Sequence, residues 1–419
     1  MLIKPISSLD AVIELPGTKS YTQRALLVAG LADGLSRLHG PAHCDDVSYF
    51  VHGLRAFGIK LEKDGLDYVV HGSKGDLSAP RAQLELDNNG SAMRFLTAAA
   101  ALAPGTTRLT GDERGNVRPI EALVKAMAEL GARVRCDRNG CPPVLVEGGH
   151  FVGGHAKLDA TSSSQYLSAL LMIAPYADRD VELELLGSLP STLYVDLTIK
   201  VMHDFGIEVK NDNYRNFYVR AGQCYSAQEY DIEADASAAM PFMAAAAIVP
   251  GKVRFQKLSM HSKQADVLFS KILERMGCTI DWGEGWLSLA GPEELEPIKV
   301  EMSAMPDAVP SLAVVAAFAR GDSHIYGMAN LRRKESDRIT ALEAELGKMG
   351  IAVESGADEM VIHGGNPKSA LIDSHDDHRI AMAFAAAGLK LGLEIARPGC
   401  VSKSFPDFFK RLKELESAG

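Results

Sequence analysis

The chain has 419 residues and lacks the features that mark secreted, membrane-spanning and nucleic-acid-binding proteins. No apolar h-region of a signal peptide follows Met1. Its longest apolar runs, such as 238–250, are shorter than the ~18 residues that a membrane-spanning helix needs. A net charge of −10 argues against nucleic acid as a partner, because such proteins usually carry a basic surface. These absences, with 47% hydrophobic and 23% charged residues, favour a soluble globular protein of the cytoplasm.

Motifs for metals and nucleotide cofactors are also lacking. The six cysteines form no CxxC pair and no zinc spacing, which favours reduced thiols. The segment Gly17–Ser20 lacks the full spacing of a phosphate-binding loop for nucleoside triphosphates, and no GxGxxG begins a helix. The run His375–His378 has two histidines, but the adjacent Arg379 disfavours a metal. We therefore expect neither a cofactor nor a metal.

What the sequence does contain is a unit of about seventy residues repeated six times. In each copy a strand leads into a helix of small residues, which is followed by a turn and another strand. The turn residues lie 71, 73, 73, 70 and 71 positions apart. They are Gly34, Gly105, Asp178, Gly251, Gly321 and Gly392. The predicted helices before them span 24–32, 94–104, 165–177, 238–250, 310–320 and 379–391.

A second helix and a hairpin follow in each of the first five copies. The second helices end at Gly58, Gly131, Gly206, Gly277 and Gly350, which suit the position just after a helix. Asp64-Gly65 marks one hairpin turn. The sixth copy ends instead in a polar helix over 405–416. The repeat is therefore predicted to be βαβαββ, which makes the protein α/β.

Six such units most simply form two similar domains of three units each, because they are longer than the 20–45 residues of solenoid repeats. The predicted N-terminal domain spans 18–234. A strand predicted at 11–15 would assign 1–17 to the C-terminal domain, with 235–419, if it pairs with the last unit. The chain would then cross between domains near 232–235 as well.

The segment Pro16–Arg24 joins this first strand to the first helix and carries two cations. A Lys or Arg in the first turn of a helix is disfavoured by roughly 0.3–1 kcal/mol, because the helix N-terminus is itself positive. Lys19 and Arg24 are nevertheless placed there, and Ser20 shares a helical face with Arg24. They are either solvated surface charges or ligands of an anion docked on the turn.

Cations recur at equivalent helix starts along the chain, namely at Lys19, Arg24, Arg94, Arg118, Lys334, Arg338 and Arg379. Each of these cations, taken alone, is interpreted as a solvated surface charge. Their repetition favours helix N-termini that bind more than one anionic group, most plausibly phosphate and carboxylate.

Three residues near these starts keep two interpretations each, and two cations are predicted to lie close together. Lys334 and Arg338 are predicted to lie on one helical face, where their like charges repel. Glu335 between them is a general acid–base or an ion-pair partner. Asp307, after Pro306, is a helix cap or a base, with the cap favoured. Gly90 is a turn glycine or the point where a ligand approaches the backbone.

Taken together, the motifs resemble the 5-enolpyruvylshikimate-3-phosphate synthase family of enolpyruvyl transferases. The matching segments are Pro16–Ser20 with Arg24–Leu26, Asn88–Arg94, Arg118-Pro119, Ser163–Gln165, Ser191–Tyr194, Pro306-Asp307, Asn330–Arg338, Asp377–Arg379 and Lys403–Pro406. The chain departs from the family at Thr18, at Asn89 with Ser91, and at Phe95. The family fold is two domains of three βαβαββ units (an inside-out α/β barrel) with the active site in the cleft between them.

The resemblance implies transfer of the enolpyruvyl group of phosphoenolpyruvate to the 5-hydroxyl of shikimate 3-phosphate, by a monomer without a cofactor. This step belongs to the shikimate pathway of chorismate and aromatic amino acid biosynthesis. The residues implied for shikimate 3-phosphate are Lys19, Ser20, Arg24, Ser163, Ser164, Gln165, Ser191, Tyr194, Asp307, Asn330 and Lys334. Those implied for phosphoenolpyruvate are Lys19, Asn88, Gly90, Arg118, Gln165, Arg338, Arg379 and Lys403. Asp307 and Glu335 would carry protons, with Lys19 assisting and His378 nearby.

Two other functions differ from this one in features that the sequence can show. The sister enolpyruvyl transferases acting on UDP-N-acetylglucosamine carry a reactive Cys in the loop before their Arg-Pro, whereas 111–118 here contains none. They also show Lys-Asn where this chain has Lys19-Ser20. A non-catalytic anion-binding protein would need the cations but neither Asp307 nor Glu335.

Overall fold

The computed structural model describes residues 1–418, which divide into two compact units. The N-terminal unit is Lys19–Ile232, and the C-terminal unit is Met1–Thr18 together with the chain from Glu233 onward. Where the chain leaves one unit and enters the other, Gly17 forms an antiparallel bridge with Ala234. Thr18 N donates to the carbonyl of Glu233 beside it, so both connecting segments begin as a pair.

In the N-terminal unit, three copies of the repeat follow one another. Its helices are α1 (Lys19–Leu31), α2 (Asp45–Ala56), α3 (Gly90–Ala100), α4 (Glu121–Glu129), α5 (Gln165–Ile173) and α6 (Thr192–Asp204), with short 3-10 turns η1 (Gly115–Val117) and η2 (Ala174–Tyr176). Its strands are β3 (Leu35–His39), β4 (Lys60–Asp64), β5 (Asp67–His71), β6 (Leu84–Glu85), β7 (Gly105–Thr110), β8 (Arg133–Arg135), β9 (Val144–Gly148), β10 (Gly154–Asp159), β11 (Val181–Leu186), β12 (Val209–Asp212), β13 (Asn216–Val219) and β14 (Glu229–Asp231).

These strands form three separate four-stranded sheets with one topology. Their orders are β14-β3-β5-β4, β6-β7-β9-β8 and β10-β11-β13-β12. The first strand of each sheet is parallel to the second, and the hairpin strands are antiparallel. In the first copy the parallel partner is β14, from the far end of the unit, so the last strand completes the first sheet.

The C-terminal unit repeats this plan. Its helices are α7 (Ala236–Ile248), α8 (Phe269–Arg275), α9 (Val309–Ala317), α10 (Arg338–Lys348), α11 (His378–Leu391) and α12 (Phe408–Ala418), with 3-10 turns η3 (Ala265–Leu268), η4 (Pro306–Ala308), η5 (Ala329–Arg333) and η6 (Pro398–Lys403). Its strands are β1 (Leu2–Ile3), β2 (Leu9–Ile13), β15 (Gly251–Gln256), β16 (Thr279–Gly283), β17 (Trp286–Ala290), β18 (Lys299–Glu301), β19 (Asp322–Tyr326), β20 (Val353–Ser355), β21 (Glu359–His363), β22 (Leu371–Asp373) and β23 (Leu393–Ala396).

Both strands that precede α1 belong to this unit. The predicted strand at 11–15 lies at Leu9–Ile13, and it pairs with β15 of the fourth copy rather than with the last copy. The last copy is completed by β1 instead, which pairs antiparallel with β23 in the three-stranded sheet β1-β23-β22. Up to residue 418 the sixth copy has no hairpin of its own, and β1 takes a place that a hairpin strand fills in the other sheets.

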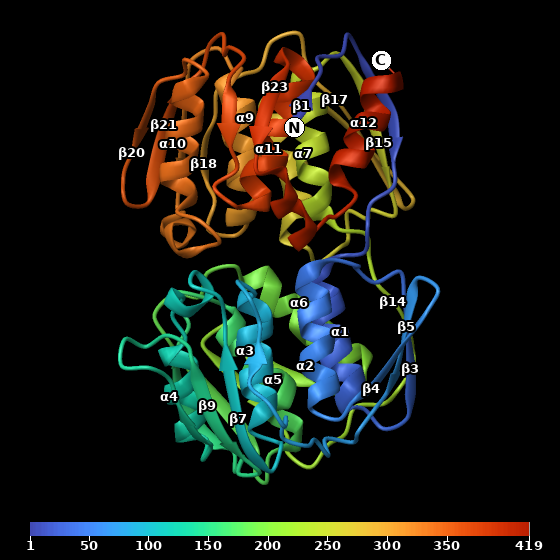
Figure 1. Cartoon of the computed structure of the whole chain (residues 1–419), viewed down its shortest axis with the longest axis vertical. Helices are drawn as coiled ribbons and strands as arrows, with labels where there is room; N and C mark the ends of the chain where they lie inside the picture. The colour runs from blue at the N-terminus through green and yellow to red at the C-terminus, as the bar shows by residue number, and fades with distance from the viewer. Residues whose placement is uncertain (419) are drawn as a thin grey trace. The chain divides into compact units, whose positions relative to one another are not determined.

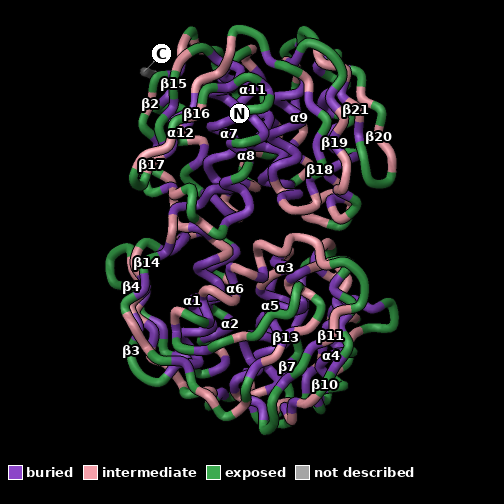
Figure 2. Tube along the Cα trace, turned by 180° about the vertical axis from the view of Figure 1, so that it is seen from behind, coloured by how far each residue is buried: buried purple, intermediate pink, exposed green. Residues whose placement is uncertain are grey.

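Small side chains explain why the first helix of each copy lies inside. All thirteen residues of α7 and all nine of α9 are buried, and α7, α9 and α11 pack on one another (Figure 1). A helix that is apolar all round must be covered on every side. In Figure 2 the trace along α7 is buried, and the exposed segments lie toward the outside of the unit.

No helix among residues 1–418 is both long enough and apolar enough to cross a membrane.

Candidate functional site

The start of α1 holds the two cations of the first motif in different environments. Lys19 Nζ lies 2.6 Å from Asp46 Oδ2, at the start of α2. Arg24, one turn further, is buried, and its Nη1 donates to the carbonyl of Ser20 at 3.0 Å. Ser20 and Arg24 therefore share a helical face, as the spacing predicted.

The other hydrogen-bond partners of Arg24 are neutral. Its Nε donates to Thr198 Oγ1 at 2.7 Å, and its Nη2 donates to the Tyr194 carbonyl at 3.3 Å. The guanidinium also lies over the Phe95 ring, 5.1 Å from the centroid. Burial lowers the pKa of Arg24 to about 10, while Tyr194 and Tyr21 act in the opposite direction, so it remains charged at neutral pH. A buried cation among neutral groups favours an anion as an additional ligand.

The start of α3 forms a second cationic group in the same unit. Arg118 Nη1 donates to Asn88, to the side-chain oxygen at 3.0 Å and to the carbonyl at 3.2 Å. Arg94 donates through Nη1 to the carbonyl of Gly90 at 2.8 Å and through Nη2 to the carbonyl of Pro119 at 3.0 Å. A Cβ on Gly90 would lie 2.6 Å from Arg118 Nη2, so the backbone and the guanidinium approach each other closely here. A small cavity opens between these groups, lined by Gly90, Arg94 and Arg118 among others.

The serine-rich starts of α5 and α6 complete this unit's share of the predicted residues. Gln165 Nε2 donates to Ser91 Oγ at 3.1 Å, which links α5 to α3. Ser163 Oγ accepts from the amide of Gln165 at 3.3 Å, and Ser164 directly precedes α5. Ser191 stands before α6 in the left-handed region, with φ 54°. The Tyr194 carbonyl accepts from Arg24, which joins α1 to the first turn of α6, and α6 packs on both α1 and α5.

In the C-terminal unit the predicted residues gather around Arg338, the first residue of α10. Its side chain is 1% exposed and contacts three carboxylates. Nη1 lies 2.8 Å from Asp307 Oδ1, Nη2 lies 2.8 Å from Glu335 Oε2, and Nε lies 2.7 Å from Asp377 Oδ2. Burial opposes the charge, but Asp377, Glu335 and Asp307 together raise the pKa of Arg338 above its ordinary value.

Asp307 is not the helix cap that the sequence favoured. It lies within η4, whose preceding residue is Met305, and α9 begins only after Ala308. Pro306 starts the 3-10 turn one residue too early for Asp307 to cap it. Its carboxylate instead lies 3.3 Å from Lys334 Nζ and 3.9 Å from Arg379 Nη2, in addition to Arg338. Burial raises the pKa of Asp307, but Lys334, Arg338 and Arg379 outweigh it and hold the pKa well below its usual range.

Lys334 and Arg338 do not share a helical face, which corrects the sequence prediction. Lys334 has an extended backbone after η5, and α10 begins at Arg338. Asp337 caps this helix by accepting from Thr340 N, so the helix begins later than the predicted face requires. Both cations still reach Asp307, and its charge relieves their repulsion. Glu335 lies in the non-helical segment between them, 11% exposed and paired with Arg338.

The start of α11 adds two further predicted residues. Asp377 caps this helix by accepting from the amide of Arg379 at 2.9 Å. Arg379 Nη1 donates to the carbonyl of Ser237, at the start of α7, at 3.1 Å. His378 is buried, with Nδ1 3.7 Å from Asp377 Oδ1. Lys403 is the last residue of η6, which packs on α11, and Asn330 lies in η5.

Three buried carboxylates lie near these cations, and no role was predicted for any of them from the sequence. Asp46 pairs with Lys19, and Asp377 pairs with Arg338. Asp266 on η3 accepts from Ser237 Oγ, next to the carbonyl that Arg379 contacts. Burial raises the pKa of Asp266 to about 6, and Arg379 opposes the shift. All three lie at the start of a first or second helix of a repeat, and this position was the feature by which the sequence could have identified them. Their partners are distant in sequence and could not be identified in this way.

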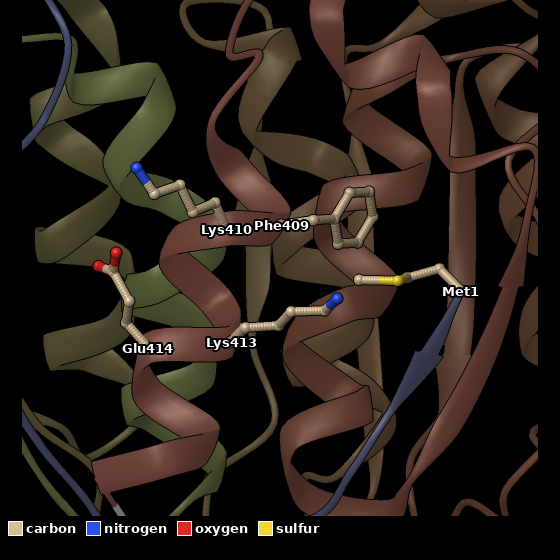
Figure 3. Close-up of a pocket in the computed structure, with 5 residues that line it drawn as sticks. All are labelled: Met1, Phe409, Lys410, Lys413 and Glu414. Carbon is tan, nitrogen blue, oxygen red and sulfur yellow. The ribbon is translucent and has the colours of Figure 1, made fainter.

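A larger cavity of about 610 Å³ lies elsewhere, beside α12, and it involves none of the predicted residues. Figure 3 shows Phe409 and Lys413 pointing from α12 toward Met1, whereas Lys410 and Glu414 point away. Within residues 1–418, no group of three or more His, Cys, Asp and Glu side chains is arranged to hold a metal.

Comparison with known proteins gives one consistent family. The sequence model of EPSP synthase (3-phosphoshikimate 1-carboxyvinyltransferase) matches residues 3–412. The chain is 42% identical over 410 residues to a 3-phosphoshikimate 1-carboxyvinyltransferase of Trichormus variabilis, covering 97% of this chain and 96% of that protein. It is 39% identical over 422 residues to the one of a Sulfurovum species, covering 99% of each.

Solved structures agree with this assignment. EPSP synthase from Acinetobacter baumannii superposes with a TM-score of 0.82 at 26% identity, covering 100% of this chain and 97% of the other. The enolpyruvyl transferase NikO from Streptomyces tendae shares the fold, with a TM-score of 0.81 at 17% identity over 99% of this chain and 97% of its own. The chain therefore belongs to the EPSP synthase (3-phosphoshikimate 1-carboxyvinyltransferase) family.

Proposed function

We propose that the protein transfers the enolpyruvyl group of phosphoenolpyruvate to the 5-hydroxyl of shikimate 3-phosphate and releases inorganic phosphate. Family membership and identities of 39% and 42% to curated enzymes of this activity support the proposal. The single observation that carries it is the cluster in which buried Arg338 holds Asp307 and Glu335 beside further cations. Cations alone bind anions, whereas carboxylates held among them can also move protons.

The cations and hydroxyls of both units would bind the four anionic groups of the two substrates. Each substrate carries one phosphate and one carboxylate, so the site must overcome their mutual repulsion. For shikimate 3-phosphate we propose Lys19, Ser20, Arg24, Ser163, Ser164, Gln165, Ser191, Tyr194, Asp307, Asn330 and Lys334. For phosphoenolpyruvate we propose Lys19, Asn88, Gly90, Arg118, Gln165, Arg338, Arg379 and Lys403. The buried guanidinium of Arg24 and the close approach of Gly90 to Arg118 support this division.

In the proposed reaction the 5-hydroxyl oxygen attacks C2 of phosphoenolpyruvate while a proton is added at C3. The tetrahedral adduct then expels phosphate as C3 gives its proton back, which restores the double bond. Charge stabilisation and alignment of the two anions supply most of the rate.

Asp307 would take the proton of the hydroxyl. The three cations around it hold its pKa low, so the carboxylate is ionised before substrate binds. Anionic substrate groups on Lys334, Arg338 and Arg379 would add negative charge beside Asp307 and raise its pKa, which makes it a better base. Glu335, held by Arg338, would exchange the C3 proton, with Lys19 assisting and His378 nearby.

The direct test measures phosphate release from phosphoenolpyruvate in the presence of shikimate 3-phosphate. We expect turnover by the wild type and a loss of roughly 10²–10⁴-fold in Glu335→Gln, as for removal of a general acid–base. Lys19→Met should lose activity similarly. Lys348→Met is a matched control on an exposed lysine of α10. Undiminished turnover in both site variants would refute the assignment.

The same assay separates the two other functions. With UDP-N-acetylglucosamine as the acceptor we expect no phosphate release, since 111–118 contains no cysteine. Phosphoenolpyruvate binding without turnover on either acceptor would instead identify a non-catalytic anion-binding protein.

We also propose that the protein acts as a monomer in the cytoplasm. None of the six cysteines, all of which lie within residues 1–418, forms a disulfide, which suits a reducing compartment. Light scattering on the purified protein should give the mass of one chain, and a mass of two or more chains would contradict the proposal.

A further inference from the structure

The turn that leads into α11 has an unusual backbone. His375 and Asp376, between β22 and α11, are consecutive non-glycine residues in the left-handed region, with φ values of 52° and 56°. Side chains rarely adopt this conformation, and it persists where surrounding groups enforce it. The residues that follow directly are Asp377, His378 and Arg379.

A buried carboxylate from another element enforces this conformation. Glu345 on α10 is 1% exposed. Its Oε1 accepts from His375 Nε2 at 2.8 Å, and its Oε2 accepts from the amide of Asp373 at 2.9 Å. The carboxylate therefore binds the turn at two residues, Asp373 and His375, which lie on either side of Ser374. On its other side Lys348 Nζ contacts both oxygens, at 2.8 and 2.7 Å.

Further hydrogen bonds fix the remainder of the turn. Ser374 Oγ donates to the carbonyl of Arg397 at 3.0 Å and accepts from the amide of Asp376 at 3.3 Å. Asp373 Oδ1 accepts from the amide of His375 at 2.8 Å. The carbonyl of Ser374 accepts from the amide of Asp377 at 2.9 Å. Glu345 of α10 therefore contacts one side chain of the turn, that of His375, in addition to the backbone amide of Asp373.

The turn in turn sets the position of the charged groups of the C-terminal unit. Asp377 binds Arg338 through Nε at 2.7 Å and Nη2 at 3.2 Å, and it caps α11 through the amide of Arg379. A displacement of the turn would therefore move Arg379 and loosen Arg338.

We propose that Glu345 is a positioning residue for Arg379 and Arg338, and that it acts through His375. This inference rests on the proposed function, in which both arginines bind phosphoenolpyruvate. It assigns a role to a buried carboxylate that lies outside the predicted site.

The test compares kinetic constants of four variants. In Glu345→Ala and His375→Ala the KM for phosphoenolpyruvate should rise about tenfold, because misplaced binding groups weaken substrate binding. The KM for shikimate 3-phosphate should change by less than about twofold, since most of its proposed ligands belong to the N-terminal unit. His375→Gln should restore the wild-type value, because its amide can donate to Glu345 where Nε2 did.

Lys348→Ala is the matched control, since it also removes a partner of Glu345 but leaves the turn in place. It should leave both KM values unchanged. If Glu345→Ala does not fold, His375→Ala decides the matter. His375 is one-third exposed, and its removal leaves the buried carboxylate of Glu345 still paired with Lys348. An unchanged KM for phosphoenolpyruvate in folded His375→Ala, or an equal rise for both substrates, would overturn the inference.

Hydrogen exchange separates a failure of this inference from a failure of the proposed function. The amides of 376–379 should exchange faster in His375→Ala than in the wild type and should be protected again in His375→Gln. If the wild type shows no turnover, the proposed function fails while this measurement still decides the role of Glu345. Unaltered exchange in His375→Ala would reject that role whatever the activity.

Discussion

Two buried arginines are held in opposite ways in the two units. Arg24 is surrounded by hydroxyls, carbonyls and an aromatic ring, so its charge is available to a bound anion. Arg338 is surrounded by three carboxylates, so most of its charge is already balanced. Arg24 therefore has the environment of a primary anion ligand, and Arg338 also organises the acids that the reaction requires.

A single methyl group at Gly90 should weaken phosphoenolpyruvate binding. The Cβ of Gly90→Ala would meet Arg94 Nη1 and lie 2.6 Å from Arg118 Nη2, so both guanidinium groups must move away. We expect the KM for phosphoenolpyruvate to rise about tenfold or more, with little change for shikimate 3-phosphate. Gly347→Ala, on the open surface of α10, is the control because its Cβ would meet nothing within 4 Å. Steady-state kinetics with each substrate varied would show the difference, and equal KM values in both variants would contradict it.

Asp266 should make stability depend on pH in the acidic range. Its folded pKa of about 6 lies above its unfolded value of 3.8. The folded state therefore binds the proton more tightly, and stability falls as pH rises from about 4 to about 6. Asp266→Asn removes this dependence. As the pH rises over that range, the difference in free energy of unfolding between the variant and the wild type should therefore shift by roughly 2–3 kcal/mol in favour of the variant.

Urea unfolding followed by tryptophan fluorescence measures this selectively, because Trp282 and Trp286 are the only tryptophans and both belong to the C-terminal unit. Asp281→Asn, a change at a half-exposed carboxylate of β16, is the control. A difference between Asp266→Asn and wild type that stays constant from pH 4 to pH 7 would show that Asp266 is ionised throughout.

The positions of cations at the helix starts could be predicted from the sequence, as could Asp307 and Glu335, but the other carboxylates beside these cations could not. Lys19, Arg24 and Arg338 stand out because a cation at a helix start opposes the helix dipole. Asp46, Asp266 and Asp377 are ordinary acids at helix starts, where they are expected as caps. Only the tertiary fold brings Asp377, 39 residues away, to Arg338.

Among the elements, the repeat positions of helices and turns were predicted well because small residues and glycines mark them. The five glycines after the second helices all have positive φ, from 79° to 100°. The start of α10 was predicted four residues too early, because Asp337 rather than Lys334 or Glu335 satisfies its first amides. The pairing of β2 was also missed, since its partner β15 lies more than 230 residues away.

Two glycines in turns should differ in how strongly a methyl group destabilises the C-terminal unit. Gly350→Ala introduces a side chain at φ 79° into open space, which costs about 1–2 kcal/mol for the left-handed backbone alone. In Gly251→Ala, at φ 126°, the Cβ would also lie 2.7 Å from the carbonyl carbon of Leu9 in β2. We expect a loss about 2 kcal/mol larger at Gly251, in line with overpacking. Tryptophan fluorescence in urea would measure both, and equal losses would show that β2 yields without cost.

At the scale of the molecule, each unit is completed by a strand from a distant part of the chain. β14 completes the first sheet of the N-terminal unit, and β1 and β2 complete two sheets of the C-terminal unit. The six repeats indicated two domains, and the periodic turns predicted the order of helices and strands within each repeat. Which strand fills which edge was not readable, because two-residue strands such as β1 carry almost no pattern.

The C-terminal unit should therefore need the first eighteen residues in order to fold. A fragment beginning at Glu233 lacks β1 and β2, which leaves β15 and β23 with open edges and exposes apolar core. We expect it to be unfolded or aggregated on its own and to fold when a peptide of residues 1–18 is added. Tryptophan fluorescence and circular dichroism would report this, with a peptide carrying Ile3→Asp and Ile13→Asp as the control. Folding of the fragment without any peptide would contradict the expectation.

The placement of β1 and β2 also has a consequence during synthesis. These strands emerge from the ribosome before the N-terminal unit, yet their partners β15 and β23 emerge after the whole of it. At 5–20 residues per second, Leu2, Ile3, Leu9 and Ile13 wait on the order of tens of seconds for the strands they pair with. The nascent chain thus carries two unpaired apolar strands while the N-terminal unit folds behind them, so the C-terminal unit can complete its sheets only after its last strand has been made.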